Sequence, residues 1–165
     1  MAFRKHRAGE IVIEQTRDLS CVRAILERGG MITDGIEWPP ACYLIAFDGV
    51  DAVGVVGVEP MLDAALIRSL YVNESHRKRG LGAQLVTAAR KAAHTRGART
   101  LYLFACPERA GFFQRLGFVE TEKKRLIGAL GGTPEAEYHQ KRPRELATER
   151  AFVLDISQDG IIDRS

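Results

Sequence analysis

The stretch RKRGLGA, residues 77–83, lies between a predicted strand and a predicted long helix, and it contributes most to the fold assignment. The first N–H groups of a helix lack intrahelical partners and carry partial positive charge, so a helix that starts here can receive a phosphate. Gly80 and Gly82 have no side chain to keep a phosphate from the backbone, and three basic residues directly precede Gly80. The stretch therefore predicts a pyrophosphate-binding loop. The alternative is a tight turn beside a solvated basic patch.

Other phosphate-binding motifs fit the chain poorly. A Walker loop needs G-x-x-x-x-G-K-[ST], and the chain contains no such run. A dinucleotide fingerprint needs G-x-G-x-x-G, but Leu85 occupies the position of the third glycine.

The segments around the loop alternate between strand and helix patterns. Hydrophobic runs and turn residues predict strands at 10–15, 42–47, 52–58, 66–72, 100–105, from 118 onward and at 152–156. The turn residues Asp48-Gly49 predict that the second and third of these strands form a hairpin. Helices are predicted from a cap at Asp18 or Ser20 to Gly29-Gly30, over 80–96 with Gly97 as its cap, and from 107 to 117. Residues 122–149 are not assigned, although part of them is expected to be helical. This order predicts an α+β fold in which helices pack on a mixed sheet.

The composition indicates one domain spanning residues 1–165, with flexible ends at 1–9 and 157–165. The longest apolar runs, such as 101–106, are far shorter than the ~20 residues of a membrane span. The basic N-terminus leads into an alternating stretch and not into an apolar signal core, so we expect a cytoplasmic protein without a membrane partner. Three dispersed cysteines predict reduced thiols and no metal site, and a net charge of +3 is too small to indicate nucleic acid.

Two motifs resemble the GNAT superfamily of N-acetyltransferases. LYV at 70–72, followed by R-x-x-G-x-G at 77–82, resembles the acetyl-CoA signature of that family. FFQRLGF at 112–118 resembles a second family motif, which ends in Gly-Phe. The resemblance extends from about residue 41 to 119. It implies a GNAT-like fold: a mixed sheet of six to seven strands, splayed in the middle and flanked by about four helices.

The resemblance also implies an acetyl-CoA site and a direct reaction. Backbone amides of residues 79–83 would hold the CoA pyrophosphate, and main-chain groups near 70–72 would pair with the pantetheine arm. A neutral amine would attack the thioester while a carboxylate or water accepts its proton. The cofactor-binding residues expected on this basis are Leu70, Tyr71, Val72, Arg77, Lys78, Arg79, Gly80, Leu81, Gly82 and Ala83. By analogy with relatives of this kind, which are often homodimers, we expect a homodimer.

The second motif departs from the family pattern. Many members have a tyrosine that protonates the leaving thiolate at the position of Phe113, and a phenylalanine cannot donate a proton. The asparagine often found seven residues earlier is replaced by Cys106. Either water or another group assists the thiolate, or the chain binds CoA with little catalysis. Cys106 as a covalent nucleophile is a third interpretation, less favoured than a structural thiol.

GVVGVEP at 54–60 and LIRSL at 66–70 resemble a branch found beside arsenic-resistance genes, itself similar to the domains that make N-acetylglutamate. The implied acceptor is the amine of an amino acid or a similar small molecule. Glu59 is the candidate general base, or else a solvent-exposed residue at a strand end. Arg68, in an apolar strand, is the candidate clamp for an acceptor carboxylate, or else forms a salt bridge, with Glu59 among the possible partners. Ser69 is a weaker candidate for acceptor binding.

Four further residues have two interpretations each. Asp34 and Glu37 lie in a region that often lines the acceptor pocket in this family, but ordinary turn chemistry is favoured for Asp34. Trp38 is either an acceptor lid or a cover for the core. His76 is expected to pack against the loop and not to act as a base.

Three functions remain open from the sequence. The favoured one is acetylation of a small amine by acetyl-CoA. The others are acetylation of a protein or peptide amine, and a non-catalytic acyl-CoA-binding module, which the phenylalanine at position 113 suggests.

Overall fold

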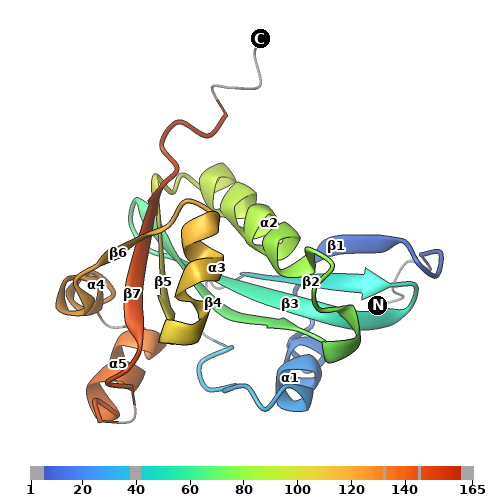
Figure 1. Cartoon of the computed structure of the whole chain (residues 1–165), viewed down its shortest axis with the longest axis horizontal. Helices are drawn as coiled ribbons and strands as arrows, with labels where there is room; N and C mark the ends of the chain where they lie inside the picture. The colour runs from blue at the N-terminus through green and yellow to red at the C-terminus, as the bar shows by residue number, and fades with distance from the viewer. Residues whose placement is uncertain (1–5, 38–41, 132, 145, 161–165) are drawn as a thin grey trace. The chain divides into compact units, whose positions relative to one another are not determined.

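A computed structural model describes residues 6–37, 42–131, 133–144 and 146–160 of the chain. Its seven strands form one sheet in the order β1-β2-β3-β4-β5-β7-β6 (Figure 1). They are β1 (Ile11–Thr16), β2 (Cys42–Asp48), β3 (Asp51–Pro60), β4 (Ala64–Val72), β5 (Thr100–Ala105), β6 (Val119–Thr121) and β7 (Arg150–Asp155). The helices are α1 (Leu19–Arg28), α2 (Leu81–Thr95), α3 (Ala110–Arg115), α4 (Lys123–Ala129) and α5 (Pro134–Lys141), with 3₁₀ turns at Glu74–His76 and Pro107–Arg109.

The predicted mixed sheet of six to seven strands flanked by helices is confirmed. The described residues contain five α-helices where about four were expected, because α4 and α5 lie in the segment that the sequence left unassigned. The splay of the strands stays a prediction. No helix among the described residues is both long and apolar enough to cross a membrane.

The chain forms two compact units. The first consists of the chain up to Glu59 together with Ile67–Ala92, and the second of Pro60–Leu66 together with the chain from Ala93 onward. The single domain and the flexible ends expected from the sequence stay predictions. Within the described part of the predicted flexible start, His6 lies 3.3 Å from Glu14 and Gly9 N donates to Asp48 Oδ1.

The first unit contains a three-stranded antiparallel arrangement at the start of the sheet. β1 pairs with β2 from Ile11 opposite Asp48 to Thr16 opposite Tyr43. β2 pairs with β3 up to the turn between Asp48 and Asp51, where Gly49 has a φ of +62°. The left-handed φ matches the twist that a two-residue hairpin turn needs, so the predicted Asp-Gly hairpin is confirmed.

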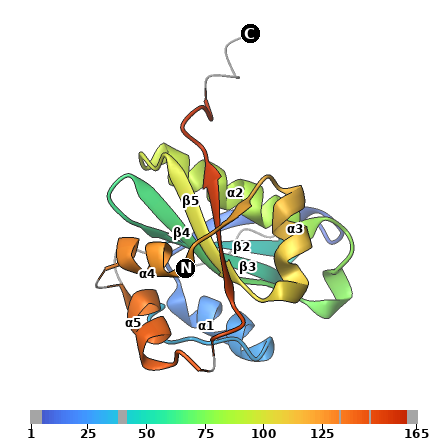
Figure 2. The same cartoon turned by 60° about the vertical axis from the view of Figure 1, so that its left-hand side comes forward.

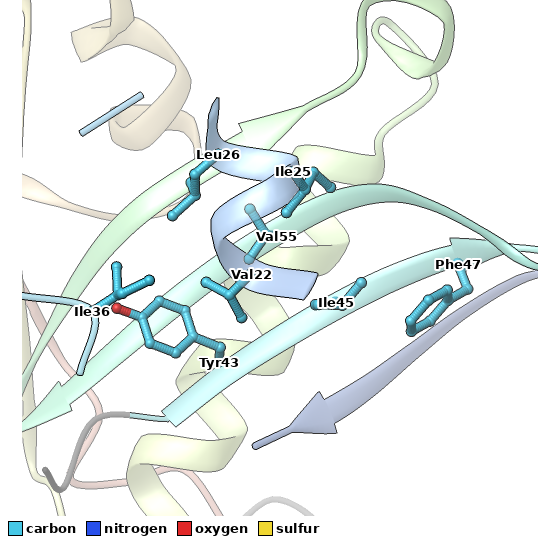
Figure 3. Close-up of a cluster of buried hydrophobic side chains, with 8 residues drawn as sticks. All are labelled: Val22, Ile25, Leu26, Ile36, Tyr43, Ile45, Phe47 and Val55. Atoms are coloured by element: carbon cyan, nitrogen blue, oxygen red, sulfur yellow. The ribbon is translucent and has the colours of Figure 1, made fainter. Parts of the chain in front are cut away.

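Helices cover both faces of these strands. On one face, Val22, Ile25 and Leu26 of α1 pack against alternate residues of β2 and against β3, as Figure 3 shows. On the other, Leu85 of α2 lies so close to Gly54 that a Cβ there would be 2.9 Å from Leu85 Cδ1. Because both faces are buried, β2 and β3 read as continuous apolar runs and not as alternating ones.

The helix α1 begins as the sequence predicts. The Asp18 side chain accepts hydrogen bonds from the N–H groups of Ser20 and Cys21, and thereby satisfies two donors of the first turn. The chain then turns at Gly29 and Gly30.

The second unit is built on β5, β7 and β6, which pair antiparallel in that order. The helices α4 and α5 lie next to each other (Figure 2) and bury a small apolar cluster that includes Leu126, Leu130 and Ala151. Phe113 of α3 is 5% exposed and makes ring contacts with Phe112, Phe118 and Phe152.

Candidate functional site

The loop between β4 and α2 has the backbone geometry of a helix start open to a ligand. The carbonyl of Gly80 accepts the N–H of Gln84 at 3.1 Å, which is the first bond of α2. The N–H groups of the next three residues therefore have no acceptor within the helix. Gly80 has a φ of +78°, a conformation that costs glycine nothing. A Cβ at this position would meet no atom within 4 Å, so the glycine is required by its backbone conformation and not by crowding.

The three basic residues of the loop have different surroundings. The Arg77 Nε donates to the carbonyl oxygen of Val72 at 2.9 Å, and its guanidinium lies 5.8 Å from the centre of the Tyr71 ring. Lys78 adopts a φ of +61°, which costs a non-glycine residue roughly 1–2 kcal/mol. Lys78 and Arg79 are both exposed. The loop thus presents three exposed cations beside the start of α2, of which Arg77 is hydrogen-bonded to the end of β4.

The C-terminal end of α1 packs against the C-terminal end of β4. A Cβ at Gly29 would lie 2.4 Å from Tyr71 Cε2, so the Tyr71 ring lies directly against the glycine backbone. The N–H of Asn73 donates to the Val53 carbonyl at 2.8 Å and keeps the chain on β3 for one residue beyond the end of β4. The Tyr71 side chain therefore packs against the end of α1, and the cofactor role expected for its main chain stays a prediction.

Glu59 and Arg68 form a buried ion pair. The Nη1 of Arg68 lies 2.6 Å from Oε1 of Glu59, and the two side chains are 7% and 1% exposed. The sequence offered a solvent-exposed strand end as the alternative for Glu59, and that alternative is wrong because the residue is buried. The salt bridge to Glu59, offered as an alternative for Arg68, is the arrangement observed.

The guanidinium of Arg68 has two further acceptors. Its Nε donates to Ser69 Oγ at 3.2 Å, and its Nη2 donates to the Asp34 carbonyl at 2.8 Å. Ser69 has a φ of +54°, which interrupts the regular backbone of β4 at this point. Because a non-glycine residue avoids this region, the hydrogen bond from Arg68 helps to hold Ser69 in it. Such local strain is typical of functional sites.

Gly57 leaves the space that Arg68 occupies. A Cβ at Gly57 would lie 2.8 Å from Tyr43 Cε1 and 3.0 Å from Arg68 Cγ. The Tyr43 ring lies beside Ile36, in the loop that also supplies the carbonyl for Arg68 (Figure 3). The side chain of any other residue at Gly57 would displace either the ring or the arginine.

The loop after α1 is held by two arginines. Arg68 binds the Asp34 carbonyl, and Arg23 donates to Thr33 Oγ1 at 3.1 Å and pairs with Glu37. Asp34 is exposed, and its contact with Arg68 is made by the backbone. Trp38, interpreted above as either an acceptor lid or a cover for the core, lies outside the described residues. The structure therefore brings Glu59, Arg68 and Ser69 together with the backbone of this loop.

Sequence reasoning missed the partner of His76. Its Nε2 lies 2.9 Å from Asp48 Oδ2, and its Nδ1 lies 2.8 Å from Ser75 Oγ. The hydrogen bond with His76, the N–H of Gly9 and the positive charge of Arg79 hold the pKa of Asp48 below its ordinary value. The only signal in the sequence was the Asp-Gly turn, which indicated a hairpin and not a contact with His76.

The two departures from the family motif lie in the second unit. Phe113 is buried among aromatic rings. Cys106 is half-buried, and a hydrogen bond from its side chain contributes, after the backbone N–H of Glu108 itself, to lowering the pKa of Glu108. Among the described residues, no group of three or more His, Cys, Asp or Glu side chains is arranged to hold a metal ion.

Residues 39–120 match the family model of the acetyltransferase (GNAT) domain. Solved structures share the fold at low identity. An acetyltransferase of the GNAT family from Staphylococcus aureus has a TM-score of 0.66 at 13% identity, over 89% of this chain and 99% of that one. The protein Rv2747 of Mycobacterium tuberculosis, in complex with CoA, has a TM-score of 0.67 at 14% identity, over 87% of this chain and 98% of that one.

N-acetylglutamate synthase from Neisseria gonorrhoeae, complexed with coenzyme A and N-acetylglutamate, has a TM-score of 0.65 at 17% identity. The match covers 89% of this chain but only 35% of the synthase chain, so the likeness concerns about a third of that protein. No curated protein matches the chain in sequence.

Proposed function

Because residues 39–120 are an acetyltransferase domain of the GNAT family, we propose that this chain transfers the acetyl group of acetyl-CoA to the amine of a small molecule, an amino acid or a similar compound. The observation that carries the cofactor assignment is the loop from Arg77 to Ala83. It combines an open helix start, a left-handed Gly80 and three exposed cations. Backbone N–H groups at a helix start and nearby cations are what a pyrophosphate requires.

In this proposal the main chain at the end of β4 binds the pantetheine arm. The Val72 carbonyl already accepts from Arg77, and a carbonyl oxygen has two lone pairs, so it can also accept from a pantetheine amide. The acyl end of the cofactor would then lie toward Ser69, where the left-handed backbone interrupts the strand. A backbone N–H exposed by such an interruption can stabilise a developing oxyanion.

The chemistry is a direct transfer. The lone pair of a neutral amine forms a C–N bond with the thioester carbonyl carbon, the C–S bond breaks, and CoA leaves as a thiolate. The amine loses one proton to a base. Glu59, the base expected from the sequence, is 1% exposed and accepts a hydrogen bond from Arg68, so we propose that it takes the proton through water or acts by orienting Arg68.

The acceptor assignment rests on Arg68. A guanidinium held on one side by Glu59 and on another by the Asp34 carbonyl has a fixed orientation next to the interrupted part of β4. Such a fork binds a carboxylate through paired N–H donors. The likeness to a synthase crystallised with N-acetylglutamate supports an acceptor of this class.

A thiol-release assay with acetyl-CoA tests the proposal against free amino acids, amino-acid analogues, polyamines and short peptides. CoA binding is measured in parallel by calorimetry. We expect turnover with one class of carboxylate-bearing amine. Turnover on peptides alone would overturn the small-molecule assignment, and the absence of CoA binding would overturn the cofactor site.

One observation favours a second candidate, a non-catalytic acyl-CoA-binding module. Phe113 is buried among aromatic rings and has no proton to give a thiolate. This module would bind CoA and show no turnover with any amine, and Glu59→Gln would then leave its CoA affinity unchanged.

A further inference from the structure

Asp48 connects three segments of the first unit. It ends β2, and each of its carboxylate oxygens has a partner: Oδ1 accepts the N–H of Gly9 at 2.6 Å, and Oδ2 lies 2.9 Å from His76 Nε2. These three positions are separated by 39 and 28 residues along the chain. The N-terminal segment, the β2–β3 turn and the segment before the cofactor loop therefore meet at one carboxylate.

The imidazole of His76 is oriented by both of its nitrogens. Nε2 faces Asp48 and Nδ1 faces Ser75 Oγ at 2.8 Å. An ionised carboxylate can only accept, so Nε2 carries a hydrogen and donates it to Asp48. The carboxylate is ionised at neutral pH, since the ordinary pKa of an aspartate is already acidic and this hydrogen bond, first among the causes, lowers the pKa of Asp48 further. The ring therefore has a charge-assisted contact that keeps it against the turn.

His76 directly precedes the pyrophosphate-binding loop at residues 77–83, here also called the cofactor loop, and it lies in the 3₁₀ turn Glu74–His76. Beyond it, Lys78 and Gly80 both adopt left-handed backbone conformations. The Lys78 conformation is unfavourable for an isolated chain, so the tertiary structure must maintain it. The side chains that attach the segment are His76, through Asp48, and Arg77, through the Val72 carbonyl.

From this arrangement we propose that Asp48 and His76 are positioning residues for the pyrophosphate-binding loop, and that their hydrogen bond increases affinity for the diphosphate half of CoA. The inference rests on the proposed CoA site. It assigns the role of holding the loop backbone to two residues that lie outside the family motif. Neither residue touches the cofactor in this proposal. The charge of Asp48 faces His76, the Gly9 N–H and Arg79, so it is compensated and does not repel the phosphates.

The test compares four variants with the wild-type chain. His76→Phe removes Nε2 and keeps the ring, and Asp48→Asn removes the charge at constant shape. His76→Gln is the conservative rescue, because its amide nitrogen can take the place of Nε2. His6→Phe is the matched control: it removes a second His–carboxylate pair, the 3.3 Å contact with Glu14, which does not involve the loop.

Calorimetry measures the dissociation constant of CoA. Competition experiments then measure the affinity for each half of CoA separately, with adenosine 3′-phosphate 5′-diphosphate as the nucleotide half and S-acetylpantetheine as the pantetheine half. We expect His76→Phe and Asp48→Asn to weaken CoA and the nucleotide half about ten- to a hundredfold, as for loss of a charge-assisted hydrogen bond. Binding of S-acetylpantetheine should not change, His76→Gln should restore most of the affinity, and His6→Phe should bind as the wild type does.

Three results would overturn the inference alone: unchanged CoA affinity in His76→Phe, equal weakening of both halves of CoA, or the same loss in His6→Phe. Failure of the wild-type chain to bind CoA would overturn the proposed cofactor site together with this inference.

Discussion

Arg68 Nη1 lies 2.6 Å from Glu59 Oε1, and both side chains are almost completely removed from solvent. Each charge loses its hydration in this place, and each is stable there because the other compensates it. The pair links neighbouring parts of β3 and β4, and through Asp34 it reaches the loop after α1. One buried contact therefore organises the part of the first unit where we place the acceptor.

Removing one member of this pair should destabilise the chain strongly. Arg68→Ala leaves the Glu59 carboxylate buried without its charge partner, and such changes cost about 3–5 kcal/mol of unfolding free energy. Urea denaturation followed by circular dichroism measures the loss. The control is Arg23→Ala, which breaks the exposed pair with Glu37 and should cost about 0–1 kcal/mol. Equal, small losses in both variants would show that the Arg68 pair is no more important than a surface contact.

The clamp role of Arg68 has a separate kinetic test. Arg68→Lys keeps a positive charge beside Glu59 but loses the planar fork. We expect KM for carboxylate-bearing acceptors to rise about tenfold or more, the cost of a lost charge-assisted hydrogen bond, while KM for simple amines changes little. Steady-state kinetics on both acceptor types gives the comparison. A parallel rise for both types would contradict a carboxylate clamp.

Gly82→Glu should abolish detectable CoA binding. The new side chain would place a carboxylate at the helix start, where it would compete with the pyrophosphate for the same N–H groups and repel its charge. Gly128→Glu is the matched control, because Gly128 is exposed and a Cβ there meets no atom within 4 Å. Calorimetric CoA binding by Gly82→Glu equal to that of the control would show that the loop is not the pyrophosphate site.

Replacing Gly29 by alanine should destabilise the chain although the Gly29 φ of −85° suits alanine. The added Cβ would lie 2.4 Å from the Tyr71 ring, and overpacking of this kind costs about 1–3 kcal/mol. The same change at Gly128, within α4 and with open space, should stabilise by about 0.5–1 kcal/mol. Thermal unfolding gives the melting temperature of each variant. A shift of both melting temperatures in the same direction would contradict the Tyr71 contact.

The cap of α1 predicts a pH dependence. The hydroxyl of Ser20 and the N–H of Cys21 lower the pKa of Asp18 below 3.8, so the ionised cap stabilises the folded state above about pH 3.8. As the pH falls through the lowered folded-state pKa, protonation removes that contribution. Asp18→Asn keeps a capping acceptor without a titrating group. Denaturation at a series of pH values should show the wild-type advantage over Asp18→Asn shrinking below pH 3.8; a constant difference would contradict the cap.

The sequence predicted most strands and helices within a few residues, because their signals are local. The Asp48-Gly49 turn, the Asp18 cap and the apolar runs of β2 and β3 all express backbone preferences over a few neighbouring residues. Residues 122–149 carry only weak signals of this kind. The helices α4 and α5 are short, and they are defined by burying Leu126, Leu130 and Ala136 against the strands of the second unit.

By itself, the sequence predicted the likeness to the acetyltransferase domain that the family model confirms, and it proposed the cofactor loop. It could do so because residues 77–83 are contiguous and a pyrophosphate loop depends on glycine, charge and a helix start that adjoin along the chain. It named Glu59 and Arg68 as separate candidates and offered their pairing as one alternative. Only the tertiary structure decided that they are paired and buried, that Arg68 reaches Asp34, and that His76 meets Asp48. These contacts join residues 9, 34 and 28 positions apart, and such pairs depend on strand register and helix packing over the whole unit, which no local pattern specifies.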